Sequence, residues 1–431
     1  MIRRLLPLLA GAVVFGTGLR GGPIAADQLA RFPFGGRPLG LLLHLAVIAT
    51  VFEVWRRIRD SPDEGLWAAL LFAVLPATSE AVLGAGGRGP QLATLVVLIG
   101  LLMHADGRGR LLSARLALAQ WIGLQLHVSA LALMPLILLH DALLVRRPIR
   151  DSLVRVGPGA AVAFVTLAVQ ATPGPLGQAW AAVPFIAEGL GRVLVPHTQT
   201  IAWLPEPPAP SFAGLLTIAA LGVAVGVVIL RRRSPRDPAA GLFGFGWWGL
   251  AMIPLLPTAL AGKVVPESAL YLGVVGPCLA LGGHCVGFRR WFIQIGRGKL
   301  ARGLLAAIVL LLGARSALRV QDWRDDFLLH LSAVEDEPNN AEALYRYGTY
   351  LAIQGERLSS AKSLARAYEL QPERVDIANN FAVTLMRRGR WAVAETLLRR
   401  ASARAPGDQT VKRNLARASA KDFRGATLRA P

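Results

Sequence analysis

The stretch "LLFAVLPATSEAVLGAGGRGPQLATL", residues 70–95, carries Pro76, Glu80 and Arg88 between two apolar segments. Apolar segments of about 20 residues are long enough to cross a bilayer as helices. An ionisable side chain at membrane depth is costly, so it points to a functional site unless it reaches water or an ion partner. We therefore take Glu80 as a candidate catalytic residue; alternatively it reaches water or pairs with Arg88.

The composition indicates an integral membrane protein. Of 431 residues, 53% are hydrophobic and only 17% are charged, and the mean hydropathy is +0.46, too apolar for a soluble chain of this length. The net charge of +20 comes from short arginine clusters between apolar runs. That arrangement fits the excess of basic residues in cytoplasmic loops better than nucleic-acid binding, so we expect no nucleic-acid partner.

The apolar runs predict about eleven spans and a consistent orientation. Arginine clusters such as Arg56-Arg57 and Arg289-Arg290 fall in alternate loops, which places them on one side of the membrane. The first run also has the basic start of a signal peptide, which is the alternative to a retained span. The expected spans are 4–20, 38–55, 66–84, 91–105, 112–126, 127–145, 155–172, 212–230, 241–257, 268–287 and 303–317.

With the N-terminus in the cytoplasm of a bacterium, this count places residues 318–431 in the periplasm and the chain in the inner membrane. The outer loops then hold Asp27, Arg88, His197 and Glu267, so we expect any chemical site to face outward. His197 is a candidate ligand for a phosphate or a sugar, or is simply a solvated loop histidine.

A regular repeat begins after the last span. Pro338, Pro372 and Pro406 are equally spaced, and glycines, aromatic residues and alanines recur in the same register. The spacing is the period of roughly 34 residues that is typical of tetratricopeptide repeats. The stacked helices of such repeats bind a peptide or another subunit, or pack only on their own membrane domain. The predicted division is a membrane domain at 1–317, a connector helix at 318–340, repeats at 341–374 and 375–408 with a cap to 421, and a disordered tail at 422–431.

Three stretches, two of which overlap residues 70–95, add a family resemblance. "LLFAVLPATSEAV" is similar to an "LLFAxHPxxxEAV" segment, "GGRGPQLATLVVLIGLL" to "xGRxDLLAxLFxLLAL" and "ESALYLGVVGPCLAL" to "ERYLYLPSVGFxLLL". These segments occur in the transmembrane and tetratricopeptide-repeat O-mannosyltransferases, which are glycosyltransferases of the GT-C class. The chain resembles a divergent bacterial member, and the resemblance implies an all-α, GT-C-like membrane domain followed by an α-solenoid.

The resemblance also implies an activity, which is transfer of a sugar such as mannose from a polyprenyl-phosphate carrier to a protein hydroxyl at the outer membrane face. It implies a general base in the first outer loop, where Asp27 is the only acid. Arg20, Arg31 or Arg37 would meet the lipid phosphate. The family-like spacing of Glu267 and Tyr271 makes both candidate ligands. The lipid-linked sugar is the donor substrate, the acceptor would lie in the repeat groove, and the sequence suggests no cofactor or metal site.

The chain also departs from the family pattern. Leu75 replaces a histidine, Gly89-Pro90 stands where an acid follows the arginine, and Ser268 replaces an arginine. Each change removes a polar group that would orient a substrate. The alternative function is therefore an inactive, membrane-anchored repeat scaffold that recruits a periplasmic partner, and a transporter is the third possibility.

Overall fold

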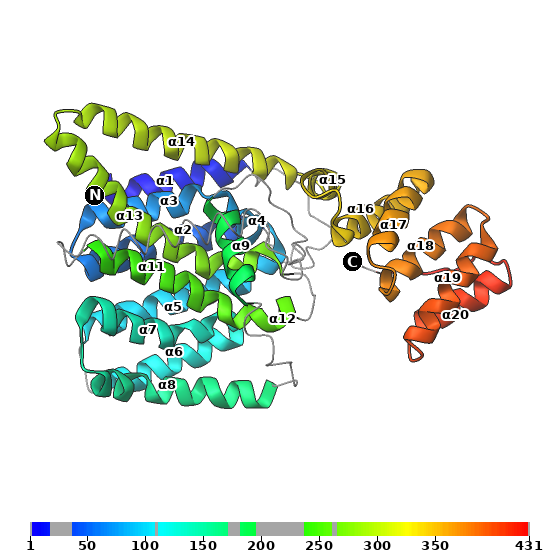
Figure 1. The fold of residues 1–431 in the computed structure, drawn as a ribbon, viewed down its shortest axis with the longest axis horizontal. Coiled ribbons are helices and arrows are strands. Elements are labelled where there is room, and N and C mark those ends of the chain that lie inside the picture. Colours follow the sequence, from blue (N-terminus) through cyan, green and yellow to red (C-terminus); the bar gives the residue numbers. More distant parts are fainter. Residues whose placement is uncertain are drawn as a thin grey trace. The chain divides into compact units, whose positions relative to one another are not determined.

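The computed structural model describes a helical protein (Figure 1). It covers residues 2–17, 37–107, 111–170, 182–194, 237–260 and 265–429. Within these ranges there is no β-strand. The chain divides into two compact units, with a boundary between Arg324 and Asp325.

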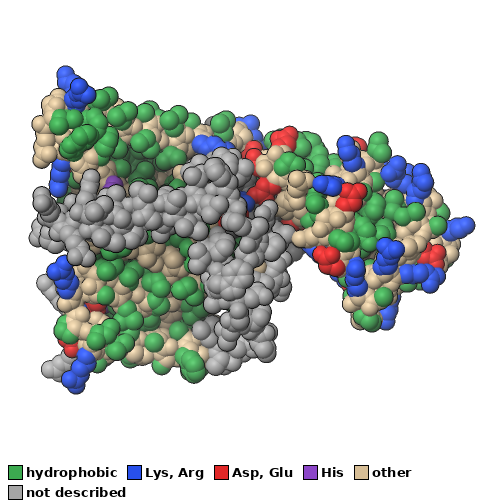
Figure 2. All heavy atoms as spheres, viewed as in Figure 1, with side chains coloured by type: hydrophobic (Ala, Val, Ile, Leu, Met, Phe, Trp, Pro, Cys, Tyr) green, Lys and Arg blue, Asp and Glu red, His purple; other side chains and the backbone are tan. Residues whose placement is uncertain are grey.

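The first unit is a bundle of apolar helices. Six of its helices are long and apolar enough to cross a membrane, and a bent pair makes up to seven. Hydrophobic side chains cover much of the visible surface of this unit (Figure 2), and Leu310 and Leu311 of one such helix are 72% and 71% exposed. Exposed leucines on that scale are favourable in lipid, so this is a multi-pass membrane protein. The six are α2 Arg37–Arg59, α5 Arg88–Asp106, Val128–Val145, Ala239–Ala259, Glu267–Gln294 and α14 Gly298–Asp322, and the bent pair is Pro62–Val74 with Pro76–Leu83.

The expected count of eleven spans is not reached by the described helices. Helices α1 Ile2–Gly16 and α6 Leu112–Leu126 each have 15 residues, which is about 22 Å of helix against a hydrocarbon core of about 30 Å. The expected span at 155–172 corresponds to α8 Ile149–Gln170 but ends beyond the described residues. The expected span at 212–230 lies wholly outside them.

The sequence suggested that Glu80 lies near the end of a straight span, and the structure differs. Helix α3 Pro62–Val74 ends at Leu75, whose backbone is extended (φ −75°, ψ 127°) because a residue that precedes proline disfavours the helical conformation. The chain then bends by 66° into a 3-10 turn, η3 Pro76–Thr78, and the short helix α4 Ser79–Leu83 that carries Glu80. At the break the Leu75 carbonyl accepts both the Thr78 hydroxyl at 2.8 Å and the Thr78 N–H at 3.2 Å, so this backbone acceptor is satisfied.

Arginines from separate clusters lie at one end of the first unit. Arg57, near the end of α2, pairs with Asp106 at the end of α5 at 2.7 Å. Arg289, near the end of α13 Tyr271–Gln294, lies 3.9 Å from Asp63 at the start of α3. Several Lys and Arg side chains are visible along this edge in Figure 2. The clusters at 56–59 and 289–290 therefore share a side of the bundle, as the loop pattern predicted.

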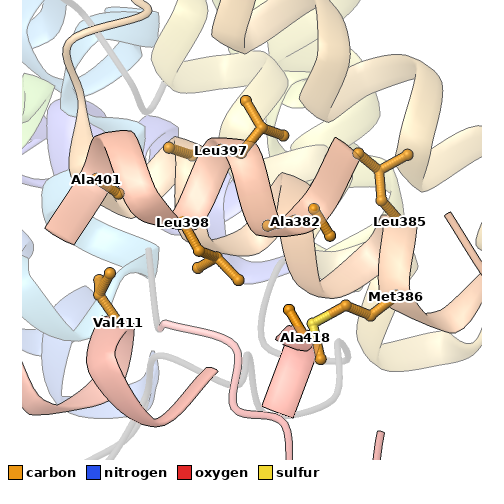
Figure 3. Close-up of a cluster of buried hydrophobic side chains, with 10 residues drawn as sticks. Ala382, Leu385, Met386, Leu397, Leu398, Ala401, Val411 and Ala418 are labelled. Carbon is orange, nitrogen blue, oxygen red and sulfur yellow. The ribbon is translucent and has the colours of Figure 1, made fainter. Parts of the chain in front are cut away.

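The described part of the second unit consists of six helices: α15 Asp326–Asp336, α16 Ala341–Gln354, α17 Arg357–Leu370, α18 Val375–Arg387, α19 Trp391–Arg404 and α20 Gln409–Ser419. The starts of α16, α18 and α20 are equally spaced, in step with the sequence repeat. Gly355 and Gly389 close the turns after α16 and α18 with φ of 88° and 74°, a left-handed conformation that suits glycine. Leu398 of α19 is fully buried among side chains of α18 and α20 (Figure 3).

Two expectations for this region differ from the structure. The predicted connector helix at 318–340 is divided between the end of α14 and α15, with a break at Trp323–Asp325, where the Asp325 side chain caps the new helix by accepting from the Leu328 amide at 2.8 Å. Residues 422–429, expected to be disordered, are hydrogen-bonded to α18 and α20. The bonds come from buried asparagines far away in the sequence, which composition does not reveal.

Candidate functional site

The carboxylate of Glu80 is held against the start of the span that begins at Glu267. The backbone N–H of Ser268 donates to Oε2 of Glu80 at 3.2 Å, and the Ser268 hydroxyl donates to Oε1 at 3.2 Å. The two residues are 188 positions apart in the sequence. Both oxygens of Glu80 thus have a neutral donor that fixes the orientation of the carboxylate.

Arg88 is a structural cap for the helix that carries Glu80. It is 7% exposed, and its Nη1 donates to the carbonyls of Ala81, Val82 and Gly84 at 3.3, 3.2 and 3.1 Å. A guanidinium at a helix C-terminus satisfies carbonyls that have no partner within the helix and complements the helix dipole. Arg88 therefore holds α4 in place beside the first turn of α5.

Helix α2 approaches this cap closely. A Cβ atom at Gly40 would lie 2.1 Å from the Val82 carbonyl oxygen and 2.4 Å from Nη1 of Arg88, so only glycine fits. The Gln91 side chain donates to the Gly40 carbonyl at 2.9 Å and joins α5 to α2. Arg37, at the start of α2 and 5% exposed, donates to the Trp323 carbonyl at the end of α14. Helices α2, α5 and α14 and the turn that carries Ser268 thus meet around α4.

Tyr271 and Glu267 lie inside the bundle. Tyr271 is fully buried and its hydroxyl lies 2.6 Å from Nδ1 of His44, with the ring of Phe72 at 5.3 Å. Glu267 is 2% exposed and adjoins Ser268, the partner of Glu80. Tyr271 accordingly contacts the core in this structure, while Glu267 and Glu80 share the surroundings of one turn, η9 Glu267–Leu270.

The structure brings five of the seven predicted site residues to one end of the bundle, namely Arg37, Glu80, Arg88, Glu267 and Tyr271. Asp27 and His197 lie outside the described residues. Ser268 was noted in the sequence only as a departure from a family pattern, and its contact with Glu80 is the feature that sequence reasoning missed. Only the adjacency of Ser268 to Glu267 hinted at it.

A second polar cluster lies in the interior of the bundle. Nε2 of His104 lies 2.8 Å from Oδ1 of Asp141, and His140 is close enough that one ligand atom from each of the three falls within 4.8 Å of the others. However, Arg147 donates to both oxygens of Asp141 at 2.8 and 2.9 Å, and the Ser152 hydroxyl donates at 2.8 Å. These donors occupy the lone pairs that a cation would need, so the cluster fits a buried ion pair better than a metal site.

The same cluster links α5 to α7 Leu133–His140 and to the first turn of α8. Sequence reasoning missed it because His104 and Asp141 are 37 residues apart. The available signal was His140-Asp141 within an apolar run, with Arg147 six positions after Asp141.

An open pocket of about 600 Å³ lies at the end of α5 away from Glu80. Its lining includes the ion pair between Arg57 and Asp106. Since α5 runs from Arg88 to Asp106, about 27 Å of helix separates this pocket from the cap beside Glu80. The two features are therefore separate sites.

Comparisons with known proteins find a partial similarity to glycosyltransferases. The chain is 31% identical over 118 residues to Protein O-mannosyl-transferase TMTC4 of Mus musculus and to that of Homo sapiens, covering 26% of this chain and 16% of each relative. It is 32% identical over 135 residues to Protein O-mannosyl-transferase Tmtc2 of Drosophila melanogaster, covering 30% of this chain and 14% of the relative. No family model and no solved structure matches.

These matches cover between 14% and 16% of the length of the curated relatives. Together with the apolar helices they describe a glycosyltransferase-like membrane protein with a partial similarity to that family.

Proposed function

From this partial similarity we propose that the protein transfers a sugar, such as mannose, from a polyprenyl-phosphate carrier to a hydroxyl group of an acceptor protein at the outer face of a membrane. The observation that carries the proposal is the carboxylate of Glu80, which two donors of Ser268 orient at 3.2 Å in a membrane protein similar in part to O-mannosyl-transferases. A carboxylate in a membrane domain that is fixed in orientation suits proton transfer at a defined position.

In the proposed reaction the acceptor oxygen attacks the anomeric carbon of the sugar. The bond between that carbon and the phosphate oxygen breaks, the polyprenyl phosphate leaves, and the hydroxyl proton passes to a carboxylate. Glu80 and Asp27 are the two proposed proton acceptors. The proposed substrate ligands are Glu267, Tyr271, His197 and Arg37, whereas Arg88 acts by holding α4, because its Nη1 donates to three main-chain carbonyls.

The proposal includes a location and an acceptor site. The proposed location is a bacterial inner membrane with a cytoplasmic N-terminus and residues 325–431 outside. The arginine clusters at one end of the bundle support this orientation. The recurrence of helix starts at 341, 375 and 409 supports a tetratricopeptide-type solenoid there, whose groove binds the acceptor.

A membrane-anchored scaffold without transferase activity is the second candidate, and one observation favours it. Groups at the Glu80 end that would bind a charged donor are engaged within the fold, since Arg37 bonds the Trp323 carbonyl, Arg88 bonds the end of α4 and Tyr271 bonds His44. In a scaffold these contacts would simply maintain the bundle.

Mass spectrometry of proteins exposed on the outer side of the membrane separates the two candidates. Cells with the wild-type gene, a deletion, Asp27→Asn or Glu80→Gln are compared for hexose-bearing serine and threonine peptides. Transferase activity predicts peptides that disappear in the deletion and in both variants, and that persist in Asp106→Asn, a control carboxylate at the opposite end of α5. Identical glycopeptides in all five strains would contradict the transferase proposal.

A further inference from the structure

Two asparagines on equivalent helices of the second unit bind the backbone of the segment that follows α20. Oδ1 of Asn414 accepts the N–H of Thr427 at 3.0 Å, and its Nδ2 donates to the Thr427 carbonyl at 2.8 Å. Oδ1 of Asn380 accepts the N–H of Arg429 at 2.7 Å, and its Nδ2 donates to the Arg429 carbonyl at 2.9 Å. Each side-chain amide thus pairs with both backbone groups of a single residue.

The spacing of these pairs matches that of an extended peptide. Asn380 and Asn414 occupy equivalent positions of successive repeats, and the residues they hold are two positions apart. Alternate residues of an extended strand are separated by about 6.6 Å and direct their backbone groups to the same side. Successive repeats therefore present one asparagine for every second residue of a bound strand.

Both amides are rigidly prepared for this role. Asn380 and Asn414 are fully buried, and the second Nδ2 hydrogen of each has its own acceptor, Thr349 Oγ1 at 3.0 Å for Asn380 and Asn379 Oδ1 at 2.8 Å for Asn414. These supporting bonds fix which amide atom lies at the N–H and which at the carbonyl of the bound residue. Little side-chain entropy is then lost when a peptide binds.

The bound segment lies on the surface and is not part of the core. Every residue from 422 to 429 is exposed or half-buried, whereas the asparagines beneath it are fully buried. Three side chains of the segment add contacts. Phe423 and Ala426 pack on the core of α18–α20, with Arg387 over the Phe423 ring at 5.2 Å, and Arg429 pairs with Asp408. The hydrogen bonds from the two asparagines go to the backbone only, so they do not depend on the side chains of the bound segment.

We infer that Asn380 and Asn414 form a ladder that binds an extended segment of another polypeptide through its backbone, and that residues 422–429 occupy this ladder in cis. The preferred occupant has a basic residue opposite Asp408 and an aromatic residue six positions before it, as in the cis segment. A tethered segment has a high effective concentration. A partner peptide therefore binds only when its concentration and affinity are high enough to displace the cis segment. The inference extends the acceptor-binding part of the proposed function, but it involves no sugar and its test needs no donor.

Fluorescence anisotropy with the full chain in detergent micelles tests the ladder. The probe is a labelled peptide with the sequence of residues 421–431, and the proteins are the wild type and a variant that lacks 422–431, which also removes Phe423 from its position under Arg387. We expect the shortened protein to bind the peptide at least about tenfold more tightly than the wild type, whose own segment competes. Asn380→Ala with Asn414→Ala in the shortened protein removes four hydrogen bonds and lowers the affinity at least about tenfold.

Two altered peptides separate backbone recognition from side-chain recognition. N-methylation at the positions of Thr427 and Arg429 removes the two donors while keeping every side chain, and we expect at least about tenfold weaker binding. Exchange of the Thr427 and Leu428 side chains for serine and alanine keeps the backbone, and we expect a change below about threefold.

Hydrogen exchange of α16–α20 establishes that the shortened protein keeps its fold. If that protection is lost, full-length Thr427→Pro, which lacks one donor to the ladder, replaces the shortened protein in the same titrations. The ladder is overturned if the folded shortened protein, or the folded Thr427→Pro protein, does not bind the peptide. It is also overturned if the two altered peptides lose affinity equally. Neither result bears on sugar transfer, and absence of transfer would leave the ladder intact.

Discussion

Arg374 joins two carboxylates at the connection between α17 and α18. Its Nη1 donates to Oε2 of Glu342 at 2.6 Å, while its Nε and Nη2 donate to the two oxygens of Asp376 at 3.1 and 2.5 Å. The Arg374 side chain is 26% exposed and that of Glu342 is 5% exposed. Replacement by methionine would keep most of the volume but leave both carboxylates without this partner, although Arg346 still bonds Glu342 at 2.7 Å.

The expected loss follows from the exposure of the groups. Breaking a fully buried ion pair costs roughly 3–5 kcal/mol, and an exposed pair contributes roughly 0–1 kcal/mol. The network of Arg374 lies between these cases, so Arg374→Met should destabilise the second unit by about 2 kcal/mol. A change of that size increases the equilibrium constant for opening of the second unit about 30-fold.

Hydrogen exchange followed by mass spectrometry measures this shift within the full chain. The most protected amides of α16 and α18 should exchange about 30-fold faster in Arg374→Met than in the wild type. Arg366→Met is the matched control, because Arg366 pairs with Glu369 at side-chain exposures of 49% and 64%, and it should change exchange by less than about threefold. The reasoning fails if the two variants behave alike or if Arg374→Met exchanges at the wild-type rate.

Three further predictions concern both units. Gly40→Ala should lower the melting temperature of the detergent-solubilised protein, because the new Cβ would lie 2.1 Å from a carbonyl oxygen of α4. Gly157→Ala is the control, since its Cβ would have no atom within 4 Å and the variant should melt like the wild type. Equal melting temperatures for the two variants would contradict the close approach. Burial raises the pKa of Asp376, but the hydrogen bond and charge of Arg374 outweigh it and hold that pKa below its usual range. The stabilisation by Asp376 is therefore present above about pH 4, and it is lost as the pH falls through the lower folded-state pKa. The urea midpoint should therefore fall less steeply with acid in Asp376→Asn, and parallel profiles would refute this. Leu398→Ala, at a fully buried position, should cost about 2–5 kcal/mol and speed exchange in α18 and α20; wild-type exchange there would contradict the packing.

The all-helical membrane architecture was predictable because it depends on local patterns. Long apolar runs and the arginines between them are read directly from the sequence, and the helices of the second unit begin at the period that the prolines and glycines indicate. The bend at Leu75 also had a local signal, since Pro76 follows it. The position of Glu80 on a separate short helix was nevertheless missed, because a proline predicts a break but not a 66° change of direction.

The contacts of the site depend on residues that are distant in the sequence and so were not predictable. Glu80 meets Ser268 across 188 positions, and no local pattern identifies that pairing. The residues around Arg429 illustrate the same point, because its partner Asn380 is 49 positions away. The recurrence of Asn380 at Asn414 was visible at the repeat spacing, but recurrence alone does not say what the side chains bind.

Sugar transfer by the purified full-length protein tests the central claim most directly. The protein in lipid nanodiscs is mixed with polyprenyl-phosphate mannose and a serine- and threonine-rich peptide, and the gain of one hexose is followed by mass spectrometry. Glu80→Gln keeps one acceptor oxygen for the Ser268 N–H, and its amide can donate to the Ser268 hydroxyl, but it cannot take up a proton. It should therefore lower the rate at least about 100-fold while the melting temperature stays near that of the wild type. Transfer by the wild type that Glu80→Gln leaves unchanged, or no transfer by a folded wild type, would contradict the account.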